Sequence, residues 1–135
     1  MLPFEHRSQL RVRYGETDQM GVVWHGNYIL YFEAARTEAM RACGGSYREL
    51  EEAGVMMPVV EVGVRYIRPA HYDDLLTIVV RIEDPPGARM TFTYNVLNEE
   101  GETLATGHTV LAFMDAATRR PCRPPNTLRR LFSRN

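Results

Sequence analysis

The sequence contains no lysine, only two cysteines and no long apolar run. Cys43 and Cys122 have the spacing of neither a disulfide framework nor a metal site, so we expect two reduced thiols. No segment approaches the ~18 continuous apolar residues that cross a bilayer. The first thirty residues lack the apolar core of a secretory signal. We therefore expect a cytoplasmic protein without membrane insertion.

The charge is almost balanced but unevenly placed. All 16 basic residues are arginines, and 17 acidic residues bring the net charge to −1. This balance gives no general attraction to nucleic acid, and no nucleic-acid partner is expected. Residues 119–135 nevertheless carry arginines and no acid. This basic C-terminal tail is either solvated chain or an anion site, for example for the phosphates of a coenzyme A.

The 135 residues fit one domain, residues 1–135, because the chain shows no repeat, linker or low-complexity segment. Proline-rich stretches at 85–87 and 121–125 predict a loop between strands and the end of the folded domain. The expected order of elements is one strand, a long helix, a short helix and four strands. That order indicates an α+β fold in which one long helix packs on an antiparallel sheet.

The long helix is predicted from apolar residues that recur at four- and three-residue spacing. These residues are Tyr28, Phe32, Ala35, Ala39 and Ala42. The Gly44–Gly45 pair is expected to end this helix. Ser46 and Glu49 have the spacing of a capping box, which predicts a short second helix ending near Gly54.

Strands are predicted where apolar and polar residues alternate. The first is expected at Leu10, Val12 and Tyr14, and others over residues 60–66, 76–82 and 90–96. Residues 98–101 predict a hairpin turn, and residues 103–114, apolar on both faces, a central or covered strand. We expect the second face of the sheet to carry apolar residues also, and hence an oligomer.

The loop from Tyr14 to Tyr28 contains the residues that are candidates for a catalytic role. The first N–H groups of the following helix have no partner within the helix, and they carry the positive end of its dipole. Such an end can hold an anion or polarise a carbonyl oxygen, and Gly26 lets a ligand approach the backbone. Asp18 lies in the same loop, so a carboxylate and a polarising helix end are predicted to meet, as acyl transfer requires.

Each of these residues also has a purely structural interpretation. An aspartate before a helix is commonly a cap or a turn residue, and a single histidine such as His25 commonly fills a structural hydrogen-bonding role. Glu33 can simply favour the helix N-terminus. His71 and His108 have no companions that suggest a metal, so no metal is expected. The residues alone leave these alternatives open.

The pattern of Tyr14, Thr17–Asp18, Gly21–Val23, His25 and Asn27–Tyr28 resembles the 4-hydroxybenzoyl-CoA thioesterase family of hotdog proteins. It is most similar to the branch of small bacterial acyl-CoA thioesterases that includes the Tol-Pal-associated members. The resemblance continues through residues 31–36, 58–60, 66–70 and 72–77, and covers most of the chain to about Met114.

The resemblance implies a hotdog fold, an antiparallel sheet wrapped around one long helix, and homodimers that often pair into tetramers. It places the active site at the dimer interface. It makes Asp18 the catalytic carboxylate, either general base or nucleophile. The N–H groups at His25 and Gly26 become the oxyanion hole. A histidine at position 25, where the aromatic-substrate members have tyrosine, points to the short-acyl branch.

The implied reaction is hydrolysis of an acyl-CoA to free acid and coenzyme A, with no cofactor beyond the coenzyme A of the substrate. Contacts with the substrate are expected from Tyr14, Val23, Trp24, Tyr28, Glu33 and Arg89. Arg89 stands in a region where relatives carry basic residues that contact coenzyme A.

Two other functions remain as alternatives. An acyl-thioester dehydratase, another use of the hotdog fold, would employ His25 and Glu33 and would leave Asp18 without a role. A non-catalytic module that binds acyl-CoA or a protein partner would not need Asp18 either. Replacing Asp18 by asparagine therefore separates the thioesterase from both alternatives.

Overall fold

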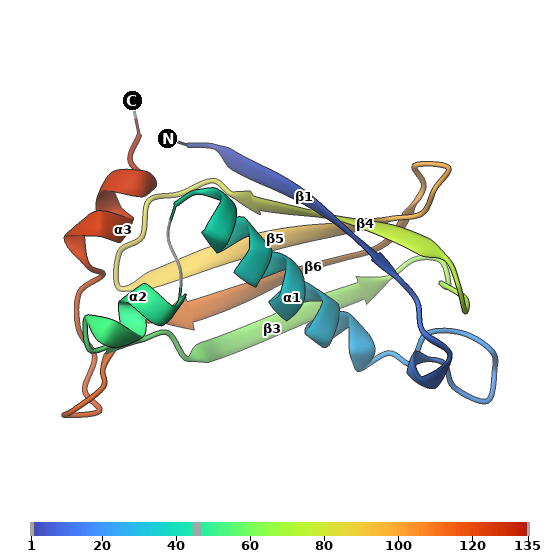
Figure 1. The fold of residues 1–135 in the computed structure, drawn as a ribbon, viewed down its shortest axis with the longest axis horizontal. Coiled ribbons are helices and arrows are strands. Elements are labelled where there is room, and N and C mark those ends of the chain that lie inside the picture. The colour runs from blue at the N-terminus through green and yellow to red at the C-terminus, as the bar shows by residue number, and fades with distance from the viewer. Residues whose placement is uncertain (1, 45–46, 135) are drawn as a thin grey trace.

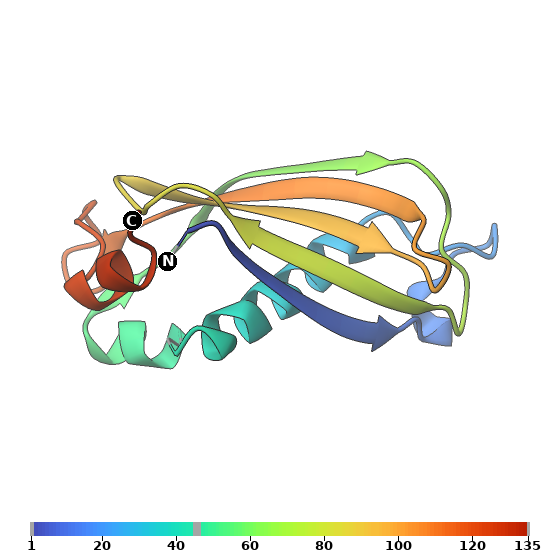
Figure 2. The ribbon, with the colours of Figure 1, turned by 90° about the horizontal axis from the view of Figure 1, so that it is seen from above.

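The computed structural model describes residues 2–44 and 47–134 as a five-stranded antiparallel sheet that curves around one long helix (Figure 1). The strand order is β1-β4-β5-β6-β3, and Figure 2 shows α1 lying along the concave side. This arrangement confirms the predicted α+β hotdog fold. The main elements are β1 (Phe4–Arg11), α1 (Asn27–Ala42), β3 (Val59–Tyr66), β4 (Leu75–Ile82), β5 (Arg89–Leu97) and β6 (Thr103–Ala112). The smaller ones are a 3-10 turn (Tyr14–Glu16), α2 (Tyr47–Glu52), β2 (Val55–Met56), β7 (Met114–Asp115) and α3 (Asn126–Leu131).

The core lies between α1 and the concave face of the sheet. Alternate residues of β4 and β5 point toward the helix, as their period of two requires. Phe32 of α1 is fully buried and stacks on Tyr94 of β5 with ring centroids 4.2 Å apart. Gly107 of β6 lies under the Phe32 ring, where a side chain would collide with it. The helix can therefore sit close to the sheet.

The buried face of α1 differs in detail from the predicted one. Tyr28, Phe32, Ala35 and Ala39 are buried as expected, but Ala42 is exposed. Further buried residues of α1 are Tyr31, Arg36 and Met40. Met40, rather than Ala42, faces the pocket between α1 and the C-terminal helix α3. The predicted second helix is present as α2, while Gly45 and the capping residue Ser46 lie outside the described residues.

The first strand lies earlier than predicted. β1 ends at Arg11, and Tyr14 belongs to a 3-10 turn, so the expectation of a strand reaching Tyr14 is wrong. The turn forms because the Arg13 N–H donates to Glu16 Oε1 at 2.9 Å. Tyr14 is 76% exposed and packs edge-on against Tyr72, with ring centroids 5.6 Å apart.

The C-terminal segment is part of the folded domain. Leu128 and Phe132 are buried, and Phe132 packs edge-on against Phe4 of β1 at 5.7 Å. The expectation that folding ends near residues 121–125 is therefore wrong, because α3 closes one end of the core (Figure 1). The arginines of residues 119–134 all point outward, and Arg134 pairs with Asp84.

The two edges of the sheet differ in character. β6 lies between β5 and β3, which confirms its predicted central position, and leaves β3 at an edge. β1, the other edge, presents charged residues to solvent. The β3 edge exposes Val59, Val60 and Val62, and the charges that usually protect an edge strand, here Glu61 and Arg65, alternate with these valines and lie on the other face of the strand. Within the described residues, no helix is long and apolar enough to span a bilayer.

The convex face of the sheet carries both polar and apolar residues. Strand alternation and register place on it Thr77, Thr91, Thr93, Asn95, Thr106 and His108, together with Val79, Leu97 and Val110. His108 pairs there with Glu61 across β6 and β3 at 2.7 Å. The apolar residues of this face agree with the expectation, and the β3 edge adds a second apolar surface in Val59, Val60 and Val62.

Candidate functional site

Asp18 sits at the corner of a tight hairpin turn. Thr17 and Val23 pair as a β-bridge, and the Asp18 N–H donates to the Val22 carbonyl oxygen at 2.9 Å. The Gly21 N–H closes the turn by donating to the Asp18 carbonyl oxygen, also at 2.9 Å. Gly21 has φ +79°, in the left-handed region where glycine carries no Cβ penalty. Backbone geometry therefore fixes the position of Asp18.

The Asp18 carboxylate divides its two oxygens between two surroundings. Oδ1 accepts the Met20 N–H at 2.9 Å and the Val22 N–H at 3.4 Å, the pattern of an Asx turn. Oδ2 accepts no hydrogen bond from any described residue. The turn thus holds the carboxylate by one oxygen and leaves the other available.

The start of α1 lies beside this turn. The Trp24 N–H donates to the Glu16 carbonyl oxygen, and the Asn27 N–H donates to the Trp24 carbonyl oxygen, both at 2.9 Å. Between them, the N–H groups of His25 and Gly26 donate to no acceptor among the described residues. Gly26 is the N-cap residue and supplies no side chain to cap the helix. These donors stand at the positive end of a helix of about four turns.

Trp24 explains part of the need for glycine at position 26. A Cβ on Gly26 would lie 2.2 Å from the Trp24 ring, far inside contact distance. The Trp24 ring also tilts against the His25 ring, with centroids 4.8 Å apart. Trp24 therefore packs over the helix start and supports the His25 side chain.

Glu16 connects the Asp18 turn to the helix, a role the sequence analysis missed. Its carbonyl oxygen accepts both the Trp24 N–H and Asn27 Nδ2, the latter at 2.7 Å. Its Oε1 accepts the Tyr31 hydroxyl at 2.9 Å. Burial, followed by this bond to Glu16, raises the pKa of Tyr31. The only signal in the sequence was that a polar residue and a tyrosine stand at helix positions 27 and 31, which is too common a pattern to be specific.

Tyr66, the last residue of β3, reaches the same helix start. Its hydroxyl donates to the His25 carbonyl oxygen at 2.8 Å. Its ring packs edge-on against Tyr28, with centroids 5.3 Å apart. Tyr28 is buried, and burial raises its pKa. Sequence reasoning did not assign Tyr66 to the site, because it lies far along the chain from His25.

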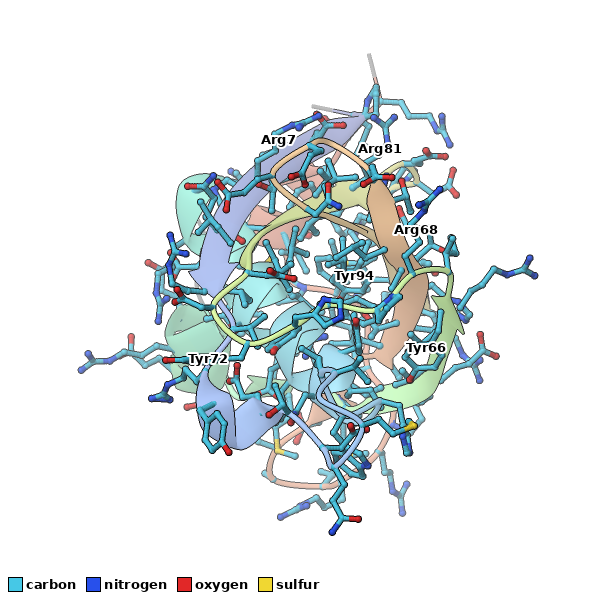
Figure 3. The ribbon with its side chains drawn as sticks, turned by 90° about the vertical axis from the view of Figure 1, so that its right-hand side faces the viewer. Arg7, Tyr66, Arg68, Tyr72, Arg81 and Tyr94 are labelled. Atoms are coloured by element: carbon cyan, nitrogen blue, oxygen red, sulfur yellow. The ribbon has the colours of Figure 1, made fainter. Side chains whose placement is uncertain are left out.

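These groups surround a pocket of about 290 Å³. Its lining residues are Asp18, Met20, Val22, Val23, His25, Tyr28, Tyr66, Ile67, Arg68 and Pro69. Figure 3 looks at this end of the molecule and shows Tyr66 and Arg68 on the β3 side. Apolar walls thus surround one carboxylate, and Arg68 supplies a cation at the boundary, where it also pairs with Glu102 at 3.1 Å. Such a site suits an acyl group that ends in a polar, reactive carbonyl.

Not every predicted site residue reaches this pocket. Four of them line it directly: Asp18, Val23, His25 and Tyr28. Gly26 and Trp24 adjoin it through the helix start. Tyr14 and Glu33 are exposed and do not line it.

Arg89 lies at the opposite end of the sheet. It begins β5, whereas the pocket is near the other end of that strand, where Arg68 N–H donates to Leu104 O beside Leu97. Eight residue steps of a strand separate the two ends by about 26 Å. Arg89 therefore cannot reach the pocket of its own subunit. Among the described residues, no three histidine, cysteine or acidic side chains group as metal ligands.

The chain is similar to known thioesterases over most of its length. Residues 12–132 match the thioesterase-like superfamily. The chain is 38% identical over 96 residues to YneP of Bacillus subtilis, covering 71% of this chain and 70% of that protein. It is 32% identical over 122 residues to the acyl-CoA thioester hydrolase YbgC of Escherichia coli, covering 90% and 91% of the two chains. The structure of a DHNA-CoA thioesterase from Staphylococcus aureus superposes with a TM-score of 0.84 at 34% identity, covering 88% of this chain and 80% of that one.

Proposed function

The chain belongs to the thioesterase-like superfamily, and we propose that it hydrolyses acyl-CoA thioesters to free acid and coenzyme A at the Asp18 pocket. One observation carries the proposal. A carboxylate with one oxygen unengaged lies in an apolar pocket beside a helix start whose first N–H groups are unpaired. The similarity to acyl-CoA thioester hydrolase YbgC supports coenzyme A as the thiol part of the substrate.

The helix start acts as the oxyanion hole in this proposal. The thioester carbonyl oxygen accepts hydrogen bonds from the N–H groups of His25 and Gly26, and the α1 dipole favours the negative charge that develops there. Removing one such donor in comparable enzymes costs roughly 3 kcal/mol of transition-state stabilisation. These donors are available because no described residue accepts from them.

Asp18 supplies the second part of the reaction. As general base, Oδ2 takes a proton from water while the water oxygen bonds to the thioester carbon, and the carbon–sulfur bond then breaks to release coenzyme A thiolate. As nucleophile, Oδ2 attacks the carbonyl carbon, expels the thiolate and forms an anhydride that water hydrolyses. Both routes yield the same products. Val22, Val23 and Ile67 hold the acyl group against the carboxylate.

We further propose that the active unit is a homodimer joined at the exposed β3 edge. The unpaired backbone and the exposed Val60 and Val62 favour pairing with a second copy of the strand. Antiparallel pairing places the Tyr66 end of one β3 beside the Val59 end of the other. Pro58 accepts the Ala112 N–H at 2.9 Å, and Ala112 pairs with Arg89. Dimerisation would thus bring the Arg89 end of one subunit toward the Asp18 pocket of the other.

This geometry offers a role for Arg89 that a single subunit does not allow, namely contact with coenzyme A phosphates. Sedimentation velocity tests the dimer: the wild type should sediment as a dimer or larger, and Val62→Arg should produce folded monomers. A wild-type monomer at assay concentration would contradict the shared site. Assembly of dimers into tetramers stays a prediction.

The proposed reaction is tested by measuring coenzyme A release from short, long and aromatic acyl-CoAs with a thiol reagent. Asp18→Asn keeps the Oδ1 acceptor that the Met20 N–H needs, so the turn persists while the charge is lost. We expect kcat to fall by about two to three orders of magnitude with substrate binding retained.

Asp115→Asn is the matched control. Asp115 Oδ1 also accepts two backbone N–H groups, from Ala117 and Thr118, each at 2.9 Å, but Asp115 is the last residue of β7, which follows the end of β6 that pairs with Arg89, away from the pocket. It should leave kcat unchanged. Full coenzyme A release by Asp18→Asn would refute a thioesterase centred on Asp18. No coenzyme A release by the wild type from any acyl-CoA would favour either the dehydratase, which eliminates water and keeps the thioester and would depend on His25 and Glu33, or the binding module.

A further inference from the structure

Among the described residues, the Tyr66 hydroxyl is the one side-chain group that bonds to the His25–Gly26 peptide unit at the helix start. It donates to the His25 carbonyl oxygen at 2.8 Å, across 41 residues of sequence. The same peptide unit carries the Gly26 N–H on its other side. A trans peptide is planar, so its C=O and N–H point in opposite directions. Fixing the direction of the His25 carbonyl therefore fixes the direction of the Gly26 N–H.

The same bond also strengthens the donor. A hydrogen bond accepted by the carbonyl oxygen polarises the peptide unit and makes its N–H a better donor, by cooperative polarisation. Gly26 has no Cβ and no capping side chain to hold this peptide in another way. The Tyr66 hydroxyl thus acts on both the aim and the strength of the Gly26 N–H.

Tyr66 is itself held in place. Its ring packs edge-on against Tyr28, which is 3% exposed, and its backbone belongs to β3 in register with Ala105 of β6. The segment that follows β3 fixes the other side of the site, because the Ala70 carbonyl oxygen accepts the Val23 N–H at 2.8 Å. The end of β3 therefore positions both the helix start and the Asp18 hairpin.

We propose that Tyr66 is a positioning residue for thioester hydrolysis: its hydroxyl orients and polarises the His25–Gly26 peptide so that the Gly26 N–H faces the thioester carbonyl oxygen. This proposal rests on the proposed function, since it requires an oxyanion hole at the helix start. It adds a residue that acts through the backbone and does not touch the reacting atoms.

The first test is the kinetics of Tyr66→Phe, which removes the hydroxyl and keeps the ring on Tyr28. The hydrogen bond from the Gly26 N–H matters most when negative charge develops on the thioester carbonyl oxygen, so weakening this donor should lower kcat about tenfold. This loss is smaller than the loss expected when an oxyanion-hole donor is removed outright. KM should stay within about twofold. Tyr72→Phe is the control, because Tyr72 is a similarly exposed tyrosine at this end of the molecule (Figure 3) whose hydroxyl bonds to no described residue. It should leave both constants unchanged.

The second test observes the donor directly. An acyl-CoA labelled with ¹³C at the thioester carbonyl is bound to Asp18→Asn, which should not turn it over, and its infrared carbonyl band is compared with that of the free thioester. The band should shift to lower wavenumber on binding. In Asp18→Asn/Tyr66→Phe the shift should be smaller than in Asp18→Asn. A purely structural role for Tyr66 would instead give the same carbonyl band for substrate bound to Asp18→Asn and to Asp18→Asn/Tyr66→Phe.

The outcomes separate the two proposals. The role of Tyr66 would be overturned, and the proposed function left standing, if the wild type hydrolyses acyl-CoA and Tyr66→Phe is equally active. The same conclusion would follow if the carbonyl band of bound substrate is the same in Asp18→Asn and in Asp18→Asn/Tyr66→Phe. A wild-type protein that hydrolyses none would overturn the proposed function itself, and the role of Tyr66 with it. Thermal unfolding of Tyr66→Phe near the wild-type temperature would show that any lost activity does not reflect lost folding.

Discussion

Two glycines on neighbouring strands give a sharp test of how α1 is seated on the sheet. A Cβ on Gly107 would lie 2.4 Å from the Phe32 ring and 2.7 Å from the Gly63 carbonyl oxygen. A Cβ on Gly63 would lie 2.3 Å from the His108 ring. The two collisions are equally close, but Gly107 faces the helix and Gly63 faces the convex side. Gly107→Ala and Gly63→Ala therefore differ mainly in whether the neighbour can move.

The Phe32 ring cannot move freely. Carbon atoms in contact normally stand about 3.5–4.0 Å apart, so Gly107→Ala demands a shift of about 1 Å or more. Phe32 is fully buried and stacks on Tyr94, so the shift must repack the core or lift the helix. Overpacking of this kind costs about 1–3 kcal/mol, and a clash against backbone as well as ring favours the upper end, about 3 kcal/mol.

His108 can rotate into solvent, because its side chain is 40% exposed. The rotation sacrifices its bond to Glu61, and exposed pairs of this kind contribute about 0–1 kcal/mol. Urea unfolding followed by circular dichroism, at one protein concentration for all variants, should therefore show Gly107→Ala destabilised by about 2 kcal/mol or more relative to Gly63→Ala. Equal destabilisation of the two variants would refute the argument that helix packing sets the cost.

Two further predictions concern stability. Burial raises the pKa of Tyr28, Tyr31 and Tyr94 above the value of about 10 in the unfolded chain, so the native state keeps protons that the unfolded state loses. The free energy of unfolding should thus be at its full value below pH 10 and fall above it, by at most about 1.4 kcal/mol per pH unit for each tyrosine. The fall should be shallower in Tyr31→Phe. A free energy of unfolding that stays constant up to pH 11.5 would contradict this prediction. Phe132→Ala should destabilise the protein by about 3–5 kcal/mol, because Phe132 is fully buried against Phe4, and a loss below 1 kcal/mol would show a dispensable tail.

The elements that the sequence predicts well are those whose periodicity is local. Alternation places Leu76 and Ile78 on the buried face of β4, and the 3.6-residue period places Phe32 and Ala35 on the buried face of α1. β1 was placed too late because His6 and Ser8 stand at inward positions and weaken the alternation. These errors arise where a polar residue takes a place that the pattern assigns to an apolar one.

The C-terminal helix was missed for a related reason. Leu128 and Phe132 are four residues apart, as one helical face requires, but prolines before them and arginines between them suggest an unfolded tail. The C-terminal segment packs into the folded domain through the apolar contact of Phe132 with Phe4, at the other end of the chain. No local pattern contains that contact.

The site was predictable only in part. The loop pattern indicates Asp18, His25 and Gly26, which the structure brings together. Glu16 and Tyr66 could not be assigned, because their roles depend on which backbone groups remain unpaired once the chain is folded. The distance of Arg89 from the pocket depends on the length and direction of β5, so the resemblance alone could not show that Arg89 lies far from the pocket of its own subunit.

Asp18 shows why a structural interpretation and a catalytic one do not exclude each other. A carboxylate has two oxygens, and a turn needs only one of them; Asp115 uses Oδ1 in the same way as Asp18 does. What separates the two residues is their surroundings. Asp18 lines a pocket, and the bonds from Trp24 and Asn27 to the Glu16 carbonyl oxygen hold the unpaired helix start beside it. An aspartate in a turn is therefore a candidate for catalysis when its second oxygen lies in a pocket beside a polarising donor. It can be such a candidate even though its first oxygen has a structural role.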